Sequence, residues 1–125
     1  MVGYNDRILV DTNIVIYILK GSKGLAELVH SKYAYLSVIS ELELLSFPKI
    51  THQEEFVINS FISDMNLINL TEAVKRETKR IRRLYGLKLP DAIIAATSSV
   101  LNCQLVTADD DFQKVTELDV NIVKP

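Results

Sequence analysis

Residues 8–19, ILVDTNIVIYIL, are apolar except for one polar triplet at the centre, Asp11, Thr12 and Asn13. The run before the triplet is rich in β-branched side chains and predicts a short strand that is buried on both faces, as in parallel sheets. We expect Asp11 to be the last residue of this strand. Thr12 or Asn13 is then expected to cap a helix over residues 14–20. A strand that ends in a carboxylate and leads into a helix is the first unit of the predicted fold.

Strand and helix patterns alternate through the rest of the chain. The predicted strands cover 33–37, 67–70, 104–107 and 120–123, and the predicted helices cover 25–31, 41–45, 51–63, 72–85 and 91–101, with a helical turn at 110–115. Strands separated by helices form parallel sheets through right-handed crossovers. The sequence therefore predicts an α/β protein, a three-layer sandwich with a central parallel sheet flanked by helices, in a single domain over residues 1–125.

Capping residues mark several of these helices, because Ser and Thr side chains accept hydrogen bonds from free N–H groups at helix starts. Thr51 and Glu54 have the Thr-x-x-Glu spacing of a capping box. Ser40 and Thr71 precede two further helices, and Gly86 is a suitable stop after residue 85. The residues of the Thr51 helix that we expect to pack inward are Phe56, Phe61 and Ile62.

The bulk composition limits the classes of protein that remain. Hydrophobic residues make up 48% and charged residues 24% of the chain, as in ordinary globular proteins. The single cysteine, Cys103, cannot form an internal disulfide, and His30 and His52 do not form a zinc motif. Residues 1–7 carry charges where a secretory signal needs an apolar core, and the apolar run 14–19 is too short for a membrane span. We therefore expect a cytoplasmic protein without a membrane partner.

Four acidic residues lie next to segments that are expected to form the core: Asp11, Glu43, Asp91 and Asp109. Each has a structural explanation, since carboxylates favour helix N-termini and turns, and Glu43 could lie on a solvent edge. Ligand sites of parallel α/β sheets, however, lie beyond the carboxyl ends of the strands, where several carboxylates would repel one another without a cation. Mg²⁺ or Mn²⁺ is the natural candidate, because hard divalent ions prefer oxygen ligands.

Four short motifs carry these acids in a fixed order along the chain. They are VDTN at 10–13, the Glu-Leu of ISELELL at 39–45, LPDAIIAAT at 89–97 and LVTADDDF at 105–112. In this order and spacing they resemble the successive acidic motifs of PIN-domain ribonucleases. The match spans nearly the whole chain without insertions, so the sequence also resembles the compact VapC-like toxins of type II toxin-antitoxin systems.

This resemblance implies roles for particular residues. The acids that map onto the family's catalytic metal ligands are Asp11, Glu43, Asp91 and Asp109. The supporting positions, which match an additional acid and polar residues that orient carboxylates or water, are Asp111, Thr12, Asn13 and Thr107. The chain departs from the pattern in two places. Glu41 lies two residues before Glu43 as an alternative acid, and SFP at 46–48 replaces the small Gly often found after the Glu-Leu pair.

The resemblance implies an Mg²⁺- or Mn²⁺-dependent endoribonuclease that hydrolyses RNA phosphodiester bonds and leaves 5′-phosphate and 3′-hydroxyl ends. It also implies a small antitoxin partner that covers the acidic site, and a homodimer. Apolar surface from the helices near 14–19 and 40–62 is a candidate for either interface, although such stripes are more often plain core.

Basic residues are concentrated in one segment of a chain whose net charge is only -2. Seven of the 14 basic residues fall between positions 75 and 88. A cationic helix surface there would bind the phosphate backbone of RNA, and the contacts we predict are from Arg76, Arg80 and Arg83. The alternative is a solvated face on which Glu72 and Glu77 offset part of the charge through local pairing.

Two other classes of protein remain open at this point. A non-catalytic PIN-like interaction module would use the same acids only to cap helices and turns, and would bind no Mn²⁺. A phosphoacceptor receiver domain has a similar length and α/β pattern, but it needs an acidic pair after the first strand and a Lys after a late strand. Asp11 has no acidic neighbour and Asp91 begins a helix, so the receiver class fits less well.

Overall fold

Five parallel strands form the central sheet, in the spatial order β3-β2-β1-β4-β5. The computed structural model describes residue 3 and residues 6–125. Within them Leu9 of the central strand pairs with Tyr35 on one side and with Leu105 on the other. The strands are β1 (Arg7–Val10), β2 (Tyr33–Ser37), β3 (Asn66–Ile68), β4 (Gln104–Thr107) and β5 (Val120–Ile122).

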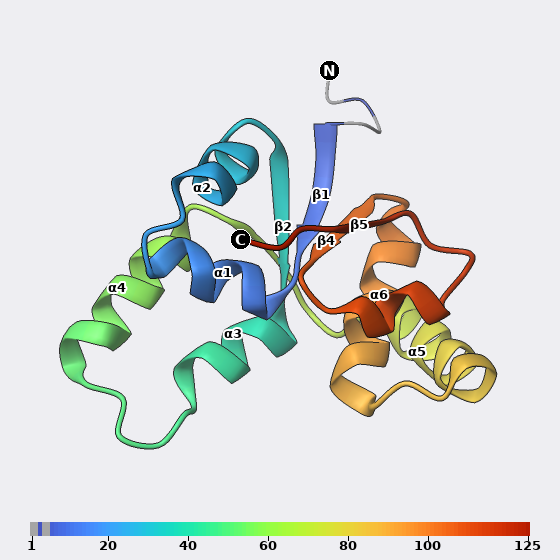
Figure 1. Ribbon diagram of the computed structural model, residues 1–125. Helices are drawn as coiled ribbons and strands as arrows, with labels where there is room; N and C mark the ends of the chain where they lie inside the picture. The colour runs from blue at the N-terminus through green and yellow to red at the C-terminus, as the bar shows by residue number, and fades with distance from the viewer. Residues whose placement is uncertain (1–2, 4–5) are drawn as a thin grey trace.

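Helices cover both faces of this sheet (Figure 1). The helices of one group are α1 (Thr12–Leu19), α2 (Lys23–His30), α3 (Val38–Leu45) and α4 (His52–Ser63). The helices of the other group are α5 (Glu72–Tyr85) and α6 (Leu89–Leu101), and a short 3₁₀ helix, η2 (Asp110–Lys114), precedes β5. The two groups lie on opposite sides of the strands, so the predicted three-layer α/β sandwich with a central parallel sheet is confirmed.

Alternating side chains of β1 contribute to a separate core on each face of the sheet. Leu9 packs with the apolar residues of α5 and α6, whereas Ile8 and Val10 pack with those of α1 to α4. The neighbouring strand β4 divides in the same way, with Leu105 in the first core and Val106 in the second. A strand covered on both faces has no solvent side, which explains its unbroken apolar sequence.

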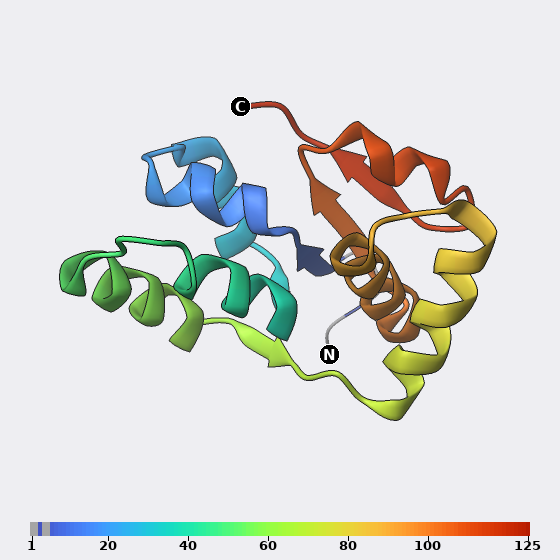
Figure 2. The ribbon, with the colours of Figure 1, turned by 90° about the horizontal axis from the view of Figure 1, so that it is seen from below.

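The order of the strands reverses between β1 and β4. From β1 the chain proceeds through β2 to β3 at one edge, and then through α5 and α6 to β4 on the other side of β1. Open α/β sheets bind ligands beyond the carboxyl ends of the strands at such a switch point. Figure 2 views the molecule from below, with the starts of α1, α3 and α6 gathered around this place.

Most predicted helix caps are confirmed, but two are wrong. The capping box of Thr51 and the left-handed Gly86 at the end of α5, with φ of 69°, are as expected. Strand β1, however, ends at Val10, and Asp11 itself caps α1 in place of Thr12 or Asn13, because its carboxylate accepts the free N–H of Thr12. Similarly, the cap of α3 is Ser37, so the helix begins earlier than predicted and Ser40 lies inside it.

The predicted inward face of α4 is partly wrong. Ile62 is buried and Phe61 is partly buried, as expected, but Phe56 is 72% exposed. The helix packs through Ile58 and Ile62, which lie four residues apart and so share a face. Phe56 lies about 200° around the helix from Ile58, on the side that faces solvent.

The segment that argues against a secretory signal, residues 1–7, lies largely outside the described residues. Within the described part of the chain, every helix is too short or too polar to cross a membrane.

Candidate active site

Asp11 lies at the carboxyl end of β1, at the start of α1, and is only 5% exposed. Its carboxylate accepts hydrogen bonds from the Thr12 N–H at 2.8 Å, the Thr107 hydroxyl at 2.7 Å and the Asn13 side-chain amide at 3.1 Å. Its own N–H donates to the carbonyl oxygen of Val106 in β4 at 2.9 Å. Contacts from α1 and β4 thus fix both carboxylate oxygens at the switch point.

The polar residues around Asp11 also hold the loop that follows β4. The Asp109 N–H donates to the Thr107 hydroxyl oxygen at 3.0 Å, and the Ala108 N–H donates to the side-chain Oδ1 of Asn13 at 3.2 Å. Thr107 and Asn13 therefore each contact Asp11 and the Asp109 loop at the same time. This arrangement brings together two motifs that lie almost 100 positions apart in the sequence.

Glu43 reaches the same edge from α3. The Thr12 hydroxyl oxygen lies 2.7 Å from Glu43 Oε1 and 2.8 Å from the hydroxyl oxygen of Ser40, which is fully buried. Ser40 and Glu43 are three residues apart and share one face of the helix. Glu41 projects about 200° away from Glu43 around the helix axis. The contact with Thr12 therefore answers the question of register in favour of Glu43.

Asp91 and Asp109 complete the acidic edge from the other group of elements. Asp91 lies in the first turn of α6 and is half-buried. Asp109 caps η2, with its Oδ1 accepting the N–H of Asp111 at 2.9 Å. Asp111 is exposed, and its charge contributes to the field at Asp91. The structure thus places all four predicted acids, and the additional one, at this end of the sheet.

The acids influence one another electrostatically. Burial raises the pKa of Asp11 from 3.8 to about 6, and the charges of Asp91 and Glu43 add to this effect. Hydrogen bonds from Thr107 and Thr12 favour the ionised carboxylate and oppose the rise in pKa. The pKa of Asp91 is also raised, first by burial and then by repulsion from Asp109 and Glu43.

The donor set at this edge consists of oxygen atoms, which are the ligands that Mg²⁺ and Mn²⁺ prefer. Among residues 3 and 6–125, no group of three or more acidic, histidine or cysteine side chains is placed to hold one metal ion. Mg²⁺ commonly keeps several waters and takes only one or two carboxylates together with substrate phosphate. Asp11, with Asp91 and Asp109 nearby, fits such a partly hydrated ion.

Two residues that the sequence analysis did not single out also belong to this region. Ser40 contacts Thr12 from within α3, and the signal that would have found it is its position one helical turn before Glu43. Lys88 precedes α6, and its charge opposes the rise in the pKa of Asp91. Its position three residues before Asp91 in the sequence could have indicated that its charge lies near this acid.

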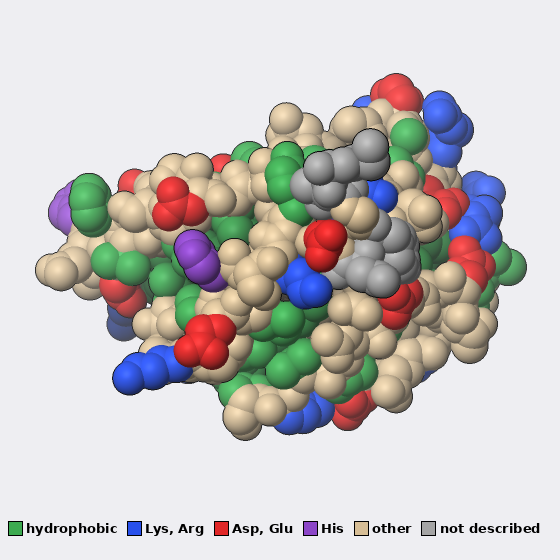
Figure 3. Space-filling model, turned by 90° about the horizontal axis from the view of Figure 1, so that it is seen from above, with side chains coloured by type: hydrophobic (Ala, Val, Ile, Leu, Met, Phe, Trp, Pro, Cys, Tyr) green, Lys and Arg blue, Asp and Glu red, His purple; other side chains and the backbone are tan. Residues whose placement is uncertain are grey.

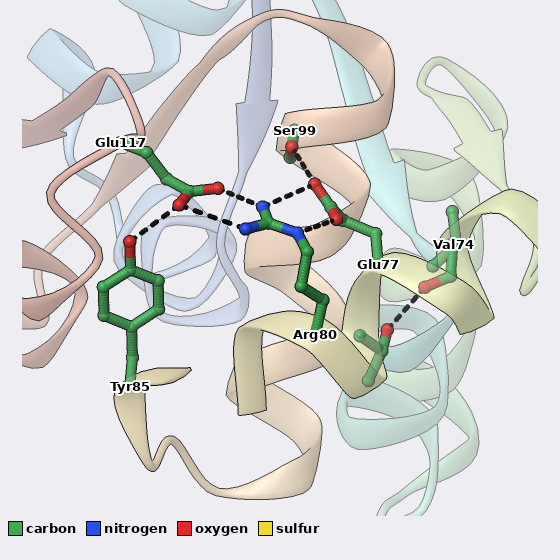
Figure 4. A network of polar contacts seen from close by, with 7 residues as sticks. Val74, Glu77, Arg80, Tyr85, Ser99 and Glu117 are labelled. Atoms are coloured by element: carbon green, nitrogen blue, oxygen red, sulfur yellow. Dashed lines mark hydrogen bonds and ion pairs between the residues drawn. The ribbon is translucent and has the colours of Figure 1, made fainter. Parts of the chain in front are cut away.

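The three arginines of α5 that were predicted to contact RNA differ in whether acidic residues of the protein already pair with them. Arg76 and Arg83 are exposed, whereas Arg80 forms ion pairs with Glu77 of its own helix and with Glu117 (Figure 4). Seen from above, basic and acidic side chains lie beside one another at the edge of the molecule on the α5 side (Figure 3). The charge of Arg80 is therefore largely compensated within the protein.

The comparison with known families agrees with the fold and the acidic edge. The model of the PIN domain matches residues 8–118, so the chain belongs to the PIN-domain family. This removes the receiver-domain alternative and confirms the resemblance found in the sequence. A search of curated proteins found no match.

Solved structures that resemble this chain include members of toxin-antitoxin complexes. A chain of a toxin-antitoxin complex from Klebsiella pneumoniae is 28% identical, with a TM-score of 0.79 over 91% of this chain and 95% of that one. A chain of the DNA-bound VapBC complex from Salmonella typhimurium is 18% identical, with a TM-score of 0.85 over 98% of both chains. A chain of VapBC-1 from nontypeable Haemophilus influenzae is 24% identical, with a TM-score of 0.81 over 93% and 97%.

Proposed function

We propose that this protein is an Mg²⁺- or Mn²⁺-dependent endoribonuclease of the cytoplasm that acts as the toxin of a type II toxin-antitoxin pair. One observation carries the proposal. Four carboxylates from different parts of the chain, Asp11, Glu43, Asp91 and Asp109, gather at the switch point of the sheet, and two of them have raised pKa values. Membership of the PIN-domain family and the likeness to toxin-antitoxin structures support it.

The residues of the edge have separable roles in this chemistry. A divalent ion, when bound, supplies Lewis acidity toward the scissile phosphate and makes water a better nucleophile. Asp11 would hold the ion, because three hydrogen bonds keep its carboxylate in one orientation. Asp91 would be a second ligand of the ion, and Glu43, oriented by Thr12, would accept a proton from water. Asp109, whose carboxylate is oriented by the N–H of Asp111, would add a further oxygen ligand or bind water of the ion.

Purified protein incubated with RNA and Mn²⁺, with and without EDTA, tests the activity. We expect metal-dependent cleavage that leaves 5′-phosphate and 3′-hydroxyl ends, and a loss of at least about 100-fold in Asp11→Asn or Asp91→Asn. Glu55→Gln is the matched control, since Glu55 is an exposed acid in the first turn of α4. Cleavage by Asp11→Asn at the rate of the control would contradict the proposal.

The alternative is a non-catalytic PIN-like module in which the acids only cap helices and turns. Asp11 and Asp109 do act as caps, which is the observation that favours it. Calorimetric titration with Mn²⁺ separates the two classes. A nuclease should bind Mn²⁺, and Asp11→Asn should lower its affinity for the ion. A non-catalytic module should show no heat of binding.

An apolar groove beside the acidic edge supports an antitoxin partner. It has a volume of about 530 Å³, and among the residues that line it are Ile16, Phe47, Val57 and the acid Glu43. These three apolar side chains are about 40% exposed and line one groove, and contiguous exposed apolar surface of this kind marks interaction sites. A protein segment seated here would contact Glu43 and so shield the acidic edge.

Paired variants on α4 test this interface in a binding assay with a candidate antitoxin protein. Val57→Ser, within the groove, should weaken the complex about tenfold or more, while Phe56→Ser should leave it unchanged. Phe56 is more exposed than Val57 but is absent from the lining of the groove. Equal loss in both variants would show that general surface hydrophobicity, rather than this groove, controls binding.

We also propose that the free protein is a homodimer, as the resemblance to these toxins implies. Light scattering on purified protein should then give a mass near twice 14.1 kDa. A mass of one chain at micromolar concentration would reject the dimer without affecting the proposed activity.

A further inference from the structure

The end of α5 and the turn that joins it to α6 carry an excess of positive charge. Residues 79–88, KRIRRLYGLK, contain five basic residues and no acidic residue. Basic residues in the last turn of a helix are favoured by the helix dipole, which accounts for one or two of them. The dipole does not account for Lys88, which lies beyond the helix, or for Lys79, which precedes its last turn.

One of these five basic residues, Arg80, already forms ion pairs with acidic residues of the protein. Arg80 Nε donates to Glu77 Oε1 at 2.6 Å, and its guanidinium also contacts both carboxylate oxygens of Glu117 (Figure 4). Tyr85 donates a further hydrogen bond to Glu117, and Ser99 to Glu77. These contacts lower the pKa of both acids, so both are ionised at neutral pH and Arg80 faces two negative charges. Arg80 thus joins α5 to the loop before β5, and Glu77 joins the same network to Ser99 of α6.

The other four basic residues remain available to a partner. Lys79, Arg82, Arg83 and Lys88 are exposed, and the ion pairs found between described residues engage Lys75, Arg80 and Lys124 instead. Lys79 and Arg83 contribute to two adjacent hollows on the surface of α5. The second hollow, of about 440 Å³, is completed by Arg82, Gly86 and Leu87.

This cationic surface continues to the acidic edge. Arg82 Nε donates to the carbonyl oxygen of Leu87 at 3.4 Å, so the last turn of α5 lies against the turn that follows it. Lys88 comes next and directly precedes α6, and Asp91 lies in the first turn of that helix. Lys88 is close enough to Asp91 that its positive charge opposes the rise in the pKa of that carboxyl.

We propose that Lys79, Arg82, Arg83 and Lys88 bind the phosphate backbone of the RNA strand next to the bond that is cleaved. This inference rests on the proposed nuclease function and identifies where its substrate lies. Several carboxylates at the acidic edge repel an RNA strand, so adjacent cations are needed to hold its flanking phosphates. The surface shares Arg83 with the set predicted from sequence. It leaves out Arg80, which is compensated, and Arg76, which lies earlier on α5, and it adds Lys79, Arg82 and Lys88.

Salt dependence of RNA binding tests the surface, with a 12-nucleotide single-stranded RNA in EDTA and fluorescence anisotropy between 50 and 300 mM salt. Each phosphate contact contributes about 0.7 to the slope of log K against log salt for a single strand. Arg82→Gln, Arg83→Gln and Lys88→Gln combined should therefore reduce the slope by about 2, and weaken binding at 50 mM salt by about tenfold or more.

The matched control removes three positive charges from the other side of the sheet. Lys20, Lys23 and Lys49 are exposed and belong to the α1 to α4 group. Their combined change to Gln should leave the slope unchanged. Equal loss of slope in both triple variants would overturn the proposal, since net charge alone would explain it. Urea unfolding of both variants verifies that each is folded.

The results also separate this inference from the proposed activity. If wild-type protein cleaves RNA and the α5 triple variant binds it with an unchanged slope, the surface is rejected and the nuclease stands. If wild-type protein never cleaves but the triple variant loses RNA binding, the surface stands and the nuclease is rejected. Unchanged RNA binding together with loss of a protein partner would assign the surface to that partner and overturn the proposal.

Discussion

The buried carboxylate of Asp11 should make the metal-free protein less stable as the pH rises. Its pKa is raised from 3.8 to about 6 in the folded chain, whereas in the unfolded chain it takes the ordinary value. Between these two values the folded state keeps a proton that the unfolded state has released, so the free energy of unfolding falls with increasing pH. At about 1.4 kcal/mol for each pH unit, and with the unfolded carboxyl already about half ionised at pH 4, Asp11 accounts for a loss of roughly 2 kcal/mol between pH 4 and pH 7.

Asp11→Asn removes this proton equilibrium. The Asn side chain also places an amide near Asn13 and Thr107, whose groups donate to the carboxylate in the wild type, and this costs stability at every pH. The slope with pH, rather than the absolute stability, is therefore the quantity to compare. The raised pKa of Asp91 contributes a slope of the same sign in both proteins, so the difference between them isolates Asp11.

Urea unfolding in EDTA at intervals from pH 4 to pH 7.5 measures both curves. The free energy of unfolding of the wild type should fall relative to that of Asp11→Asn by about 2 kcal/mol over this range. Glu55→Gln should follow the wild type. Adding Mn²⁺ at pH 7 should restore stability in the wild type and not in Asp11→Asn, because an ion that binds only the folded state stabilises it. Parallel curves for the wild type and Asp11→Asn would refute the reasoning.

Three further substitutions address the supporting contacts. Thr107→Val removes the hydroxyl that donates to Asp11, and should weaken Mn²⁺ binding in calorimetry by about 10- to 100-fold. Thr12→Val releases Glu43 from its hydrogen bond, and should slow RNA cleavage by about tenfold while Mn²⁺ affinity changes less. Gly86→Ala places a Cβ at a φ of 69°, and should lower the free energy of unfolding by about 1 kcal/mol in urea, with Gly86→Asn losing less.

Short-range patterns were sufficient to predict the framework of the site. The apolar run around Leu9 has no solvent face, and the carboxylate that follows it can only lie at the end of a strand. Asp91, next to Pro90, similarly marks the start of a helix. Each of these inferences depends on a few consecutive residues, because burial and capping leave direct traces in local sequence. Parallel topology then follows from the alternation of strands and helices.

The errors arise where the sequence offers several equivalent choices. Ser37 and Ser40 are both suitable caps, and only the docking of α3 against α1 decides between them. In α4 apolar residues occur at 56, 57, 58, 61 and 62, which surround much of the helix. The buried face is then decided by the neighbouring elements.

Contacts between residues that are far apart in the sequence could not be predicted from local sequence patterns. Glu117, which compensates Arg80, lies 37 residues further along the chain, and Ser40 lies 28 residues from Thr12. The local pairing of Glu72 and Glu77 with the basic residues was predicted and is confirmed, but the second partner of Arg80, Glu117, could not be predicted from the sequence. The distinction matters for function, because a compensated arginine contributes little to attraction of a polyanion.

The electrostatics of the acidic edge argue that its charges serve more than capping. A neutral Asn or Ser would cap α1 as well as Asp11 does, without the free energy that burial of a carboxylate costs. The chain instead surrounds Asp11 with donors that favour the ionised form, while burial and the charges of Asp91 and Glu43 oppose it. Functional sites typically combine groups that favour and groups that disfavour the charged form of one residue, and the protein loses some folding stability as a result. A bound divalent cation would remove the opposition, since it attracts all of these carboxylates at once.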